Sequence, residues 1–391
     1  MPPTKKRFAW SDVTALYYIT HKSNLASIMR YGILSHTEVE RQGIQTHTVY
    51  NQEVVNLRQS RIVDGKSLWN FANLYFQVRN PMLFQVLRHA DVPQYDEIIV
   101  LSISPEVLHL EGARVTTGNA AAGSTEIYPV NDGEKQVGAL QKIFAQEYWN
   151  STDGSKRTIM AECLVPNVIP SNLIQTVYTA RKSLKAEIDQ SLIGSEIPVI
   201  VEPYMFFRPR SSTRITEKLN IANGDMFFST LQTLTVSVNT VGIMGKGLAS
   251  RAKYQFPDVY VQYQDLCRKK SLQLGKPALY KRDSDLVTND YPDIVDGKWF
   301  LLFPTKDHWK NDSRIEPIEE GLRWLLDNYK KLGIESLAIP ALGCGLGNLS
   351  WGEVGPLMCK YLSQLDITCT IYLPQDKDIP EKYLRPDYLM P

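Results

Sequence analysis

Two glycine-rich stretches contain residue types that could bind phosphate. Residues 340–351 read PALGCGLGNLSW and residues 237–249 read SVNTVGIMGKGLA, and in both an apolar run is followed by three glycines. Ordered glycine is entropically costly, so such a loop indicates positive φ angles or a ligand against the main chain. Two glycine loops at strand ends of one α/β domain could bind a diphosphate from both sides, although a surface turn explains either stretch alone equally well.

Three single residues could also do chemistry. Glu162 lies in the apolar run IMAECLV, where strand alternation favours an outward-facing side chain and the alternative is a carboxylate held in a cleft. His21 follows a strand and precedes a helix, where it could serve only as a polar cap. Lys306 ends the apolar run WFLLFPTK, and a lysine there is a nucleophile only if desolvation or a nearby cation lowers its pKa.

Composition limits the class of protein. A chain of 391 residues predicts about two domains, and a net charge of +1 gives no overall sign of a polyanionic partner, so nucleic-acid binding needs a local patch. The five cysteines form no CxxC pair and the histidines no HExxH motif, which predicts reduced thiols and no metal site. The sequence contains no signal-peptide pattern and no apolar run of membrane-spanning length, which predicts a cytoplasmic protein.

The two halves of the chain differ in their secondary-structure pattern. From residue 219 onward, β-rich apolar runs alternate with amphipathic helices, of which 315–332 is the clearest, and this predicts an α/β domain with a mostly parallel sheet. The first half, with a helix near 24–31, predicts an α+β domain with large loops. The Ser/Arg-rich run at 208–217 indicates a linker, which gives domains at 1–207 and 218–391.

The second half resembles a macrodomain, the α/β/α three-layer fold that binds ADP-ribose. NGDMF, VNTVGIMGKGLA, FPTKDHW and PALGCGLGNLSW occur in that order over about residues 215–375, and the match is closest to the DarG antitoxins and related ADP-ribose glycohydrolases. The resemblance implies that Lys306 attacks the anomeric carbon. It also implies an ADP-ribose site built from Asp225 at the adenine, Asn239, Gly245 and Gly247 at the distal ribose, and Gly343, Cys344, Gly345, Leu346 and Gly347 around the diphosphate.

The first half resembles DarT, the family of toxins that ADP-ribosylate bases in DNA. YITHxxNLxxIxxxGIL, LYFxxRNPML and the AECLV strand carry the resemblance over about residues 14–205. It implies that NAD is the substrate, that Glu162 is the catalytic glutamate, and that Arg58, or Arg61 if the alignment slips, binds NAD and assists catalysis. An arginine on the diphosphate and a carboxylate beside the ribose would stabilise an oxocarbenium-like transition state. The other implied NAD-site residues are Tyr18, Thr20, His21, Asn24, Tyr75 and Met82.

Both halves depart from their families. The chain has Tyr18 where DarT relatives commonly have a histidine, and the loop TTGNAAAGSTEIYP differs from the histidine-containing loop of thymine-modifying members, which leaves thymine, guanine or another base as the target. Gly347 and Asn348 stand where human-type glycohydrolases carry an acidic residue, so a macrodomain that only binds ADP-ribose remains an alternative.

The sequence therefore predicts a natural fusion of a DNA ADP-ribosyltransferase toxin with its ADP-ribosylglycohydrolase antitoxin. Its predicted partners are NAD, single-stranded DNA and ADP-ribosylated DNA, together with a contact between its own toxin and antitoxin domains. A transferase acting on RNA or protein is the alternative. Candidate DNA-binding cations are KKR at 5–7, Arg58, Arg61, Lys66, Arg79, Arg88, Lys156 and Arg157, with Trp69 and Phe71 as stacking partners for bases.

Overall fold

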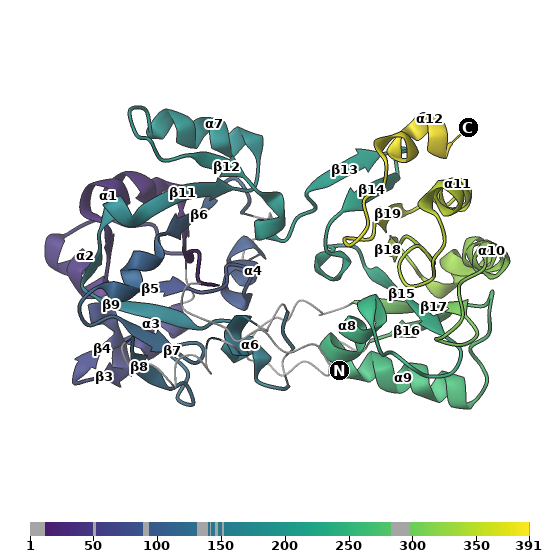
Figure 1. The fold of residues 1–391 in the computed structure, drawn as a ribbon, viewed down its shortest axis with the longest axis horizontal. Helices are drawn as coiled ribbons and strands as arrows, with labels where there is room; N and C mark the ends of the chain where they lie inside the picture. The colour runs from purple at the N-terminus through teal and green to yellow at the C-terminus, as the bar shows by residue number, and fades with distance from the viewer. Residues whose placement is uncertain are drawn as a thin grey trace. The chain divides into compact units, whose positions relative to one another are not determined.

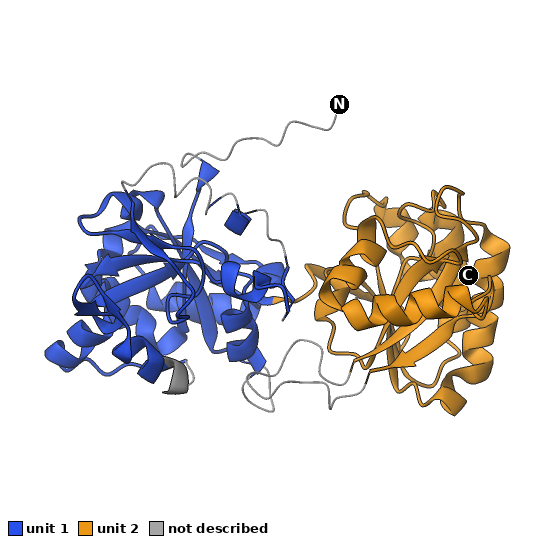
Figure 2. Cartoon of the chain, turned by 90° about the horizontal axis from the view of Figure 1, so that it is seen from below, with its two compact units in different colours: residues 1–206 blue, residues 207–391 orange. Residues whose placement is uncertain are grey.

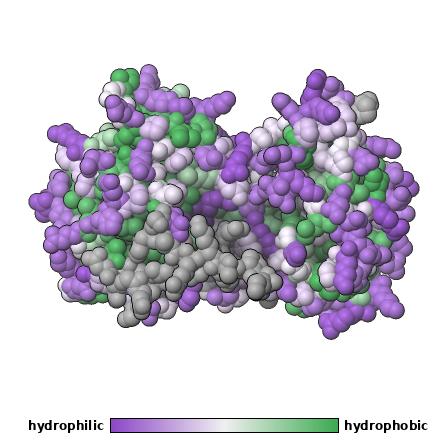
Figure 3. Space-filling model, viewed as in Figure 1, coloured by the Kyte–Doolittle hydropathy of each residue, from purple (hydrophilic) through white to green (hydrophobic). Residues whose placement is uncertain are grey.

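The structure is a computed structural model that describes residues 12–49, 52–88, 94–130, 140, 142–144, 148–150, 152–282 and 298–390. The chain divides into two compact units, residues 1–206 and residues 207–391 (Figure 2). Each unit buries its own apolar residues. On the face drawn in Figure 3, hydrophilic residues predominate and apolar patches lie on both units. Within the described residues, none of the helices has the length and hydropathy that crossing a membrane requires.

The first unit is built on an eight-stranded, mostly antiparallel sheet in the order β12-β11-β6-β1-β5-β9-β7-β8 (Figure 1). Only the pair β11 and β12 is parallel within this sheet. Its strands are β1 (Leu16–His21), β5 (Phe71–Tyr75), β6 (Ile98–Ile103), β7 (Arg114–Thr116), β8 (Ile127–Pro129), β9 (Glu162–Pro166), β11 (Ile174–Thr179) and β12 (Val199–Val201). Two short ribbons pair β2 (Ile33–Leu34) with β10 (Val168–Ile169) and β3 (Ile62–Val63) with β4 (Lys66–Ser67).

Helices of the first unit lie around this sheet and position the loops between strands. They are α1 (Leu25–Tyr31), α2 (His36–Gln42), α3 (Gln52–Ser60), α4 (Pro81–Arg88), α6 (Ser155–Thr158) and α7 (Lys182–Ser191). The helix predicted near 24–31 is α1, and Gly32 ends it with φ +83°. A Cβ at this position would lie 2.5 Å from the carbonyl oxygen of Ile169, so only glycine lets β2 approach β10. The predicted α+β class of this unit is confirmed.

The second unit is a seven-stranded sheet in the order β13-β14-β19-β18-β15-β17-β16, in which the five inner strands are parallel. Its strands are β13 (Ser211–Arg214), β14 (Leu219–Asn223), β15 (Thr233–Asn239), β16 (Ala278–Lys281), β17 (Trp299–Lys306), β18 (Ser336–Pro340) and β19 (Thr368–Tyr372). Its helices are α8 (Gly247–Gln255), α9 (Pro257–Arg268), α10 (Ile315–Leu332), α11 (Trp351–Leu362) and α12 (Pro386–Leu389).

Two separate apolar cores cover the two faces of this sheet. Helices α10 and α11 bury residues such as Leu322 and Met358 in one core, and α8 and α9 bury Ala252 and Val259 in the other (Figure 1). The predicted three-layer α/β/α class is therefore confirmed. The helix predicted at 315–332 is α10, and its C-terminal Gly333 adopts the left-handed conformation that favours glycine.

The segment predicted as a linker differs from the expectation. Residues 211–214 form β13, which pairs antiparallel with β14 at the edge of the second sheet. Side chains along an edge strand of this kind remain mostly exposed, so its Ser/Arg-rich sequence looks like a linker although its backbone is hydrogen-bonded.

Two candidate active sites

A buried ion pair forms the centre of the first site. Glu162 begins β9 with a fully buried side chain, and its carboxylate oxygens Oε2 and Oε1 lie 2.9 and 3.2 Å from Nη1 of Arg58 in the last turn of α3. The backbone N–H of Ala120 donates to Oε1 at 2.7 Å, and the backbone N–H of Glu162 donates to Oγ1 of Thr116. The outward-facing interpretation of Glu162 is wrong, because its side chain is fully buried and its carboxylate accepts from donors in two other segments.

The geometry also distinguishes the two candidate arginines. Arg61 donates to the backbone carbonyl oxygens of Ala122 and Thr125, the latter at 2.7 Å, and so braces the 119–125 loop that supplies Ala120. Arg58 is the arginine whose guanidinium reaches Glu162. Of the two alignments, the structure favours Arg58 as the partner of the carboxylate.

A pocket lies beside β1, α1 and α2. Tyr18, Asn24, His36 and His47 are among the residues that line it. Burial and the charge of Arg58 lower the pKa of His36, which places the cationic end of the ion pair within electrostatic reach of this pocket. The contacts of Trp69 agree with this proximity, because its ring stacks on His36 and its Nε1 donates to the carbonyl oxygen of Val55 in α3, the helix that carries Arg58.

Two of the implied NAD-binding residues hold a loop of the pocket wall. The amide nitrogen of Asn24 donates to Oγ1 of Thr20 at 3.0 Å and to the carbonyl oxygen of His47 at 2.9 Å, while its amide oxygen accepts from the His47 N–H at 2.8 Å. Thr20 is almost fully buried. These contacts fix the 44–48 segment over the pocket, so Thr20 shapes the wall from behind and Asn24 lines it.

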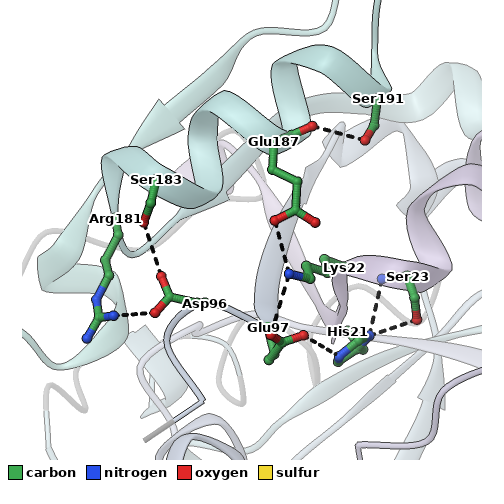
Figure 4. Close-up of polar contacts among 9 residues, drawn as sticks. All are labelled: His21, Lys22, Ser23, Asp96, Glu97, Arg181, Ser183, Glu187 and Ser191. Atoms are coloured by element: carbon green, nitrogen blue, oxygen red, sulfur yellow. Dashed lines mark hydrogen bonds and ion pairs between the residues drawn. The ribbon is translucent and has the colours of Figure 1, made fainter.

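His21 is held by polar contacts on both ring nitrogens (Figure 4). Its Nδ1 accepts from the backbone N–H of Ser23, which makes His21 a cap, and Nε2 lies 2.9 Å from a carboxylate oxygen of Glu97. Its ring stacks on His47 with centroids 3.8 Å apart. Burial, followed by the neighbouring His47, lowers the pKa of His21. The neutral ring with its proton on Nε2 fits these partners.

The same cluster fastens helix α7 to the site. Lys22 bridges Glu97, at 3.4 Å, and Glu187 of α7, at 3.0 Å. Asp96 accepts from Arg181 and, at 3.2 Å, from the hydroxyl of Ser183 (Figure 4). These contacts connect the end of β1, which carries His21, to helix α7.

The two residues implied at the nicotinamide and base side are not among the residues that line this pocket. Tyr75 stands directly opposite Glu162 across the β5–β9 pair, so the two side chains share a face of the sheet. Met82 is half-buried in the first turn of α4, and it is not among the residues that line the pocket described above. Tyr75 therefore belongs with the ion pair, and the role implied for Met82 stays a prediction.

Several of the cations and aromatic rings assigned to DNA are engaged within the fold. Phe71 is 4% exposed and packs in a small buried cluster, although it also lines the pocket, so its stacking on a base stays a prediction. Arg58 is buried at Glu162, and the Arg79 guanidinium lies 3.9 Å from the Tyr204 ring centroid. Trp69 stacks on His36 with centroids 5.2 Å apart. The KKR run at 5–7 lies outside the described residues.

The second site forms at the carboxyl ends of the parallel strands. Asn239 ends β15 and Lys306 ends β17, and the two residues are register partners in adjacent strands. The Asn239 amide oxygen accepts from the N–H groups of Val241 and Ile243 and from the hydroxyl of Tyr263, at 3.1, 3.4 and 2.8 Å. Asn239 thus builds the first glycine loop, and α8 begins at the end of that loop, at Gly247.

Lysine side chains bind three successive carbonyl groups of the second glycine loop. Nζ of Lys306 donates to the carbonyl oxygen of Leu346 at 2.6 Å, and Nζ of Lys377 donates to those of Cys344 and Gly345 at 2.7 and 3.0 Å. Burial raises the pKa of the Cys344 thiol to about 12, so Cys344 contributes its backbone and a neutral side chain. Lys377 was not found by sequence reasoning, because it lies in a segment without a motif, far along the chain from the loop that it holds.

Glycines of this loop differ in the space around them. Gly343 has φ +73°, and a Cβ on Gly347 would lie 2.4 Å from the Gly343 carbonyl oxygen and from the Ser313 hydroxyl. A Cβ on Gly345 would meet no atom within 4 Å. Gly343 and Gly347 are therefore explained by the fold of the loop, and Gly345 is explained by open space in which a ligand could lie against the main chain.

At the opposite end of the site, Asp225 is nearly buried and already paired. One carboxylate oxygen lies 2.8 Å from Nη1 of Arg251, and the other accepts from the Phe227 N–H at 3.2 Å. The role that the resemblance implies for Asp225, accepting from the adenine amino group, stays a prediction. Arg251, which sequence reasoning missed, fixes the direction of this carboxylate.

These folds and sites define a chain with an ADP-ribosyltransferase-type unit and a macrodomain unit. The family described as "ssDNA thymidine ADP-ribosyltransferase, DarT" matches residues 17–207, and the Macro domain family matches residues 236–358. A "DNA ADP-ribosyl transferase-DNA ADP-ribosyl glycohydrolase fusion protein" of Thermosipho africanus is 50% identical over 96% of this chain and 98% of its own length. The chain therefore belongs to the family of DarT-DarG fusion proteins.

Two further similarities agree with this assignment. The solved structure of Thermosipho africanus DarTG in complex with ADP-ribose matches with a TM-score of 0.91 and 48% sequence identity, covering 97% of this chain and all of that chain. A DNA ADP-ribosyl glycohydrolase of Thermus aquaticus is 35% identical over 38% of this chain and 39% of its own length. The prediction that the chain is a natural fusion of the two families is confirmed.

Proposed function

We propose that the first unit transfers ADP-ribose from NAD to a base in single-stranded DNA and that the second unit removes it. The observation that carries the transfer is the buried pair of Arg58 and Glu162 beside the pocket of the first unit. The target base stays open, because Tyr18 and the 116–129 loop depart from the thymine-modifying pattern. Both reactions would take place in the cytoplasm, where NAD and DNA occur together.

In the transfer step, the bond between nicotinamide and the ribose C1 breaks and a bond from C1 to the base forms. Positive charge develops on the ribose, and the Glu162 carboxylate stabilises it at short range. The same carboxylate then accepts the proton that the attacking base nitrogen loses. Arg58 exchanges part of its contact with Glu162 for the diphosphate of NAD, which leaves the carboxylate free to face the ribose.

In the removal step, Lys306 displaces the base from C1 of the bound ADP-ribose. Its Nζ must first lose a proton, and it lies 2.6 Å from the Leu346 carbonyl oxygen in the loop assigned to the diphosphate. The base leaves with a proton, and water then releases ADP-ribose from the lysine. Since the two units share one chain, the hydrolase meets every new adduct at high effective concentration.

The test of this proposal uses the Lys306→Ala chain, NAD and a set of single-stranded oligonucleotides that each lack one base. Intact mass is expected to reveal an ADP-ribose adduct that disappears in the Lys306→Ala, Glu162→Ala double variant. The oligonucleotide that fails to react identifies the base. Absence of an adduct on every oligonucleotide would contradict DNA modification and favour an RNA or protein substrate.

A second comparison separates removal from mere binding. The purified adduct is added without NAD to the wild-type and Lys306→Ala chains. Loss of the adduct with the wild-type chain and its persistence with Lys306→Ala support the hydrolase. An adduct that persists with both chains, while ADP-ribose still binds, would make the second unit a reader of ADP-ribose.

A further inference from the structure

Four large apolar side chains are exposed on the loops around Lys306. Val241, Ile243, Trp309 and Leu346 are 45%, 44%, 47% and 59% exposed. Single exposed apolar residues are common on protein surfaces, but a group that surrounds a reactive side chain is informative. These residues come from three different loops, which follow β15, β17 and β18.

Hydrogen bonds join these three loops around Lys306. The Thr240 N–H donates to the carbonyl oxygen of Lys306 at 3.1 Å, and its hydroxyl donates to that of Asp307 at 2.8 Å. Leu346 accepts from Nζ of Lys306 through its carbonyl oxygen, as described above. The backbone positions that present the apolar side chains are therefore fixed relative to the lysine.

An ammonium group accompanies the aromatic ring in this group. Nζ of Lys310 lies 5.1 Å from the Trp309 ring centroid. The ring centroids of His308 and Trp309 lie 5.4 Å apart. Oδ1 of the nearby Asp307 carboxylate accepts from the His308 N–H and the Asn311 side chain at 2.8 and 2.9 Å, which orients this carboxylate toward its own loop. An aromatic face beside a cation is the combination with which proteins bind single-stranded nucleic acid, by base stacking and phosphate contact.

We propose that Val241, Ile243, Trp309 and Leu346 form a docking surface, here called the Trp309 surface, for single-stranded DNA next to the ADP-ribosylated base. This inference rests on the proposed removal reaction. When ADP-ribose occupies the two glycine loops with C1 at Lys306, the base and its strand must leave the site past the side chains around Lys306. Trp309 stacks on a flanking base, and Lys310 contacts the strand's phosphates.

The test compares substrates that differ only in the DNA around the adduct. An ADP-ribosylated single-stranded oligonucleotide and an ADP-ribosylated nucleoside are added without NAD to the full-length wild-type, Trp309→Ala and Trp309→Phe chains. Loss of one base stack is expected to raise KM for the oligonucleotide about tenfold in Trp309→Ala. KM for the nucleoside, kcat and the Kd for free ADP-ribose stay unchanged, and Trp309→Phe keeps most of the affinity.

Val261→Ala is the matched control, because Val261 is 57% exposed on α9, outside the three loops. If Trp309→Ala raises KM equally for the oligonucleotide and the nucleoside, Trp309 belongs to the ADP-ribose site itself and the proposal is overturned. Unchanged KM values in Trp309→Ala would also overturn it. If the wild-type chain is a dimer and the Trp309→Ala chain is a monomer, the surface instead binds a second copy of the chain, which would also overturn the proposal.

Failure of the underlying reaction gives a different result. If the wild-type chain binds the adduct without removing it, the proposed removal reaction is wrong, but the Trp309 surface can still be tested by binding. The same variants are then compared by the Kd for the ADP-ribosylated oligonucleotide in an excess of unmodified oligonucleotide, which saturates the transferase unit. A Kd that Trp309→Ala raises about tenfold supports the surface, and an unchanged Kd overturns it.

Discussion

Arg58 and Glu162 form a buried ion pair in which one guanidinium nitrogen reaches both carboxylate oxygens, at 2.9 and 3.2 Å. The side chains are 10% and 0% exposed, so each charge depends on the other for compensation. The two groups proposed to break the nicotinamide bond thus also hold α3 against β9. In the proposed transfer reaction, NAD takes over part of this pairing, which would couple NAD binding to the position of α3.

Separate substitutions should distinguish the structural role of this pair from its catalytic role. Arg58→Ala leaves Glu162 buried without its cation, and we expect it to lower the unfolding free energy of the first unit by about 3 kcal/mol. The double variant Arg58→Met, Glu162→Gln removes both charges and should regain most of that stability without regaining transfer activity. Chemical denaturation measures this, with added ADP-ribose marking the transition of the second unit by its stabilisation. A stable Arg58→Ala chain would contradict the coupling.

The pKa of His36 predicts how the first unit responds to acid. Burial and the neighbouring Arg58 lower the pKa of His36 below its ordinary value of 6.5 in the folded chain. As the pH falls below about 6.5, the unfolded chain therefore binds a proton that the folded chain does not, and the unfolding free energy decreases. Between about pH 7.5 and about pH 5.5, wild type should lose more stability than His36→Gln. His109→Gln, at an exposed histidine, is the control, and parallel pH profiles for all three chains would contradict the prediction.

The sequence predicted the fold well where periodicity reports burial directly. Helix α10 begins and ends where its apolar spacing and Gly333 predict, and the alternation of strands and helices identified the parallel sheet of the second unit. The orientation of Glu162 could not be predicted in this way, because alternation assumes that one face of a strand meets solvent. Strand β9 is covered where Glu162 begins it, by Arg58 from a helix about a hundred residues earlier.

Long-range polar contacts account for the rest of what the sequence could not reveal. The motif that contains Thr20 and Asn24 indicated a binding site, but not that Asn24 bonds the backbone of His47. The two glycine loops were recognisable from their spacing, whereas Lys377 and Arg251, which hold their surroundings, carry no local pattern. A residue that acts by binding a backbone carbonyl or another side chain belongs to no motif, so its role cannot be predicted from a single sequence.

Lys377 should position the second glycine loop for ADP-ribose. Lys377→Met keeps the aliphatic stem but removes the ammonium that binds two loop carbonyls, and we expect the Kd for ADP-ribose to rise about tenfold. Lys377→Arg should recover part of the affinity, because a guanidinium can donate to the same oxygens. Isothermal titration with ADP-ribose measures the effect, with Lys331→Met at the exposed end of α10 as the control. Equal Kd values for Lys377→Met and the control would exclude this role.

Two glycines of the same loop should respond to alanine in different ways. A Cβ on Gly345 would meet no atom within 4 Å, so Gly345→Ala should leave the melting temperature of the second unit unchanged. If the diphosphate lies against this main chain, the added methyl group occupies its place, and the Kd for ADP-ribose should rise at least about tenfold, which corresponds to about 1.4 kcal/mol.

Gly347→Ala provides the contrast, because its Cβ would lie 2.4 Å from the Gly343 carbonyl oxygen and the loop must shift to accept it. We expect this variant to lose about 1–3 kcal/mol of stability and to bind ADP-ribose more weakly as a consequence of the displaced loop. Thermal denaturation and isothermal titration on both variants separate the two causes. Among the three glycines of this loop, only Gly345 has open space beside its main chain. Tight binding of ADP-ribose by Gly345→Ala would therefore mean that the diphosphate does not lie over Gly345, whatever the result for Gly347→Ala.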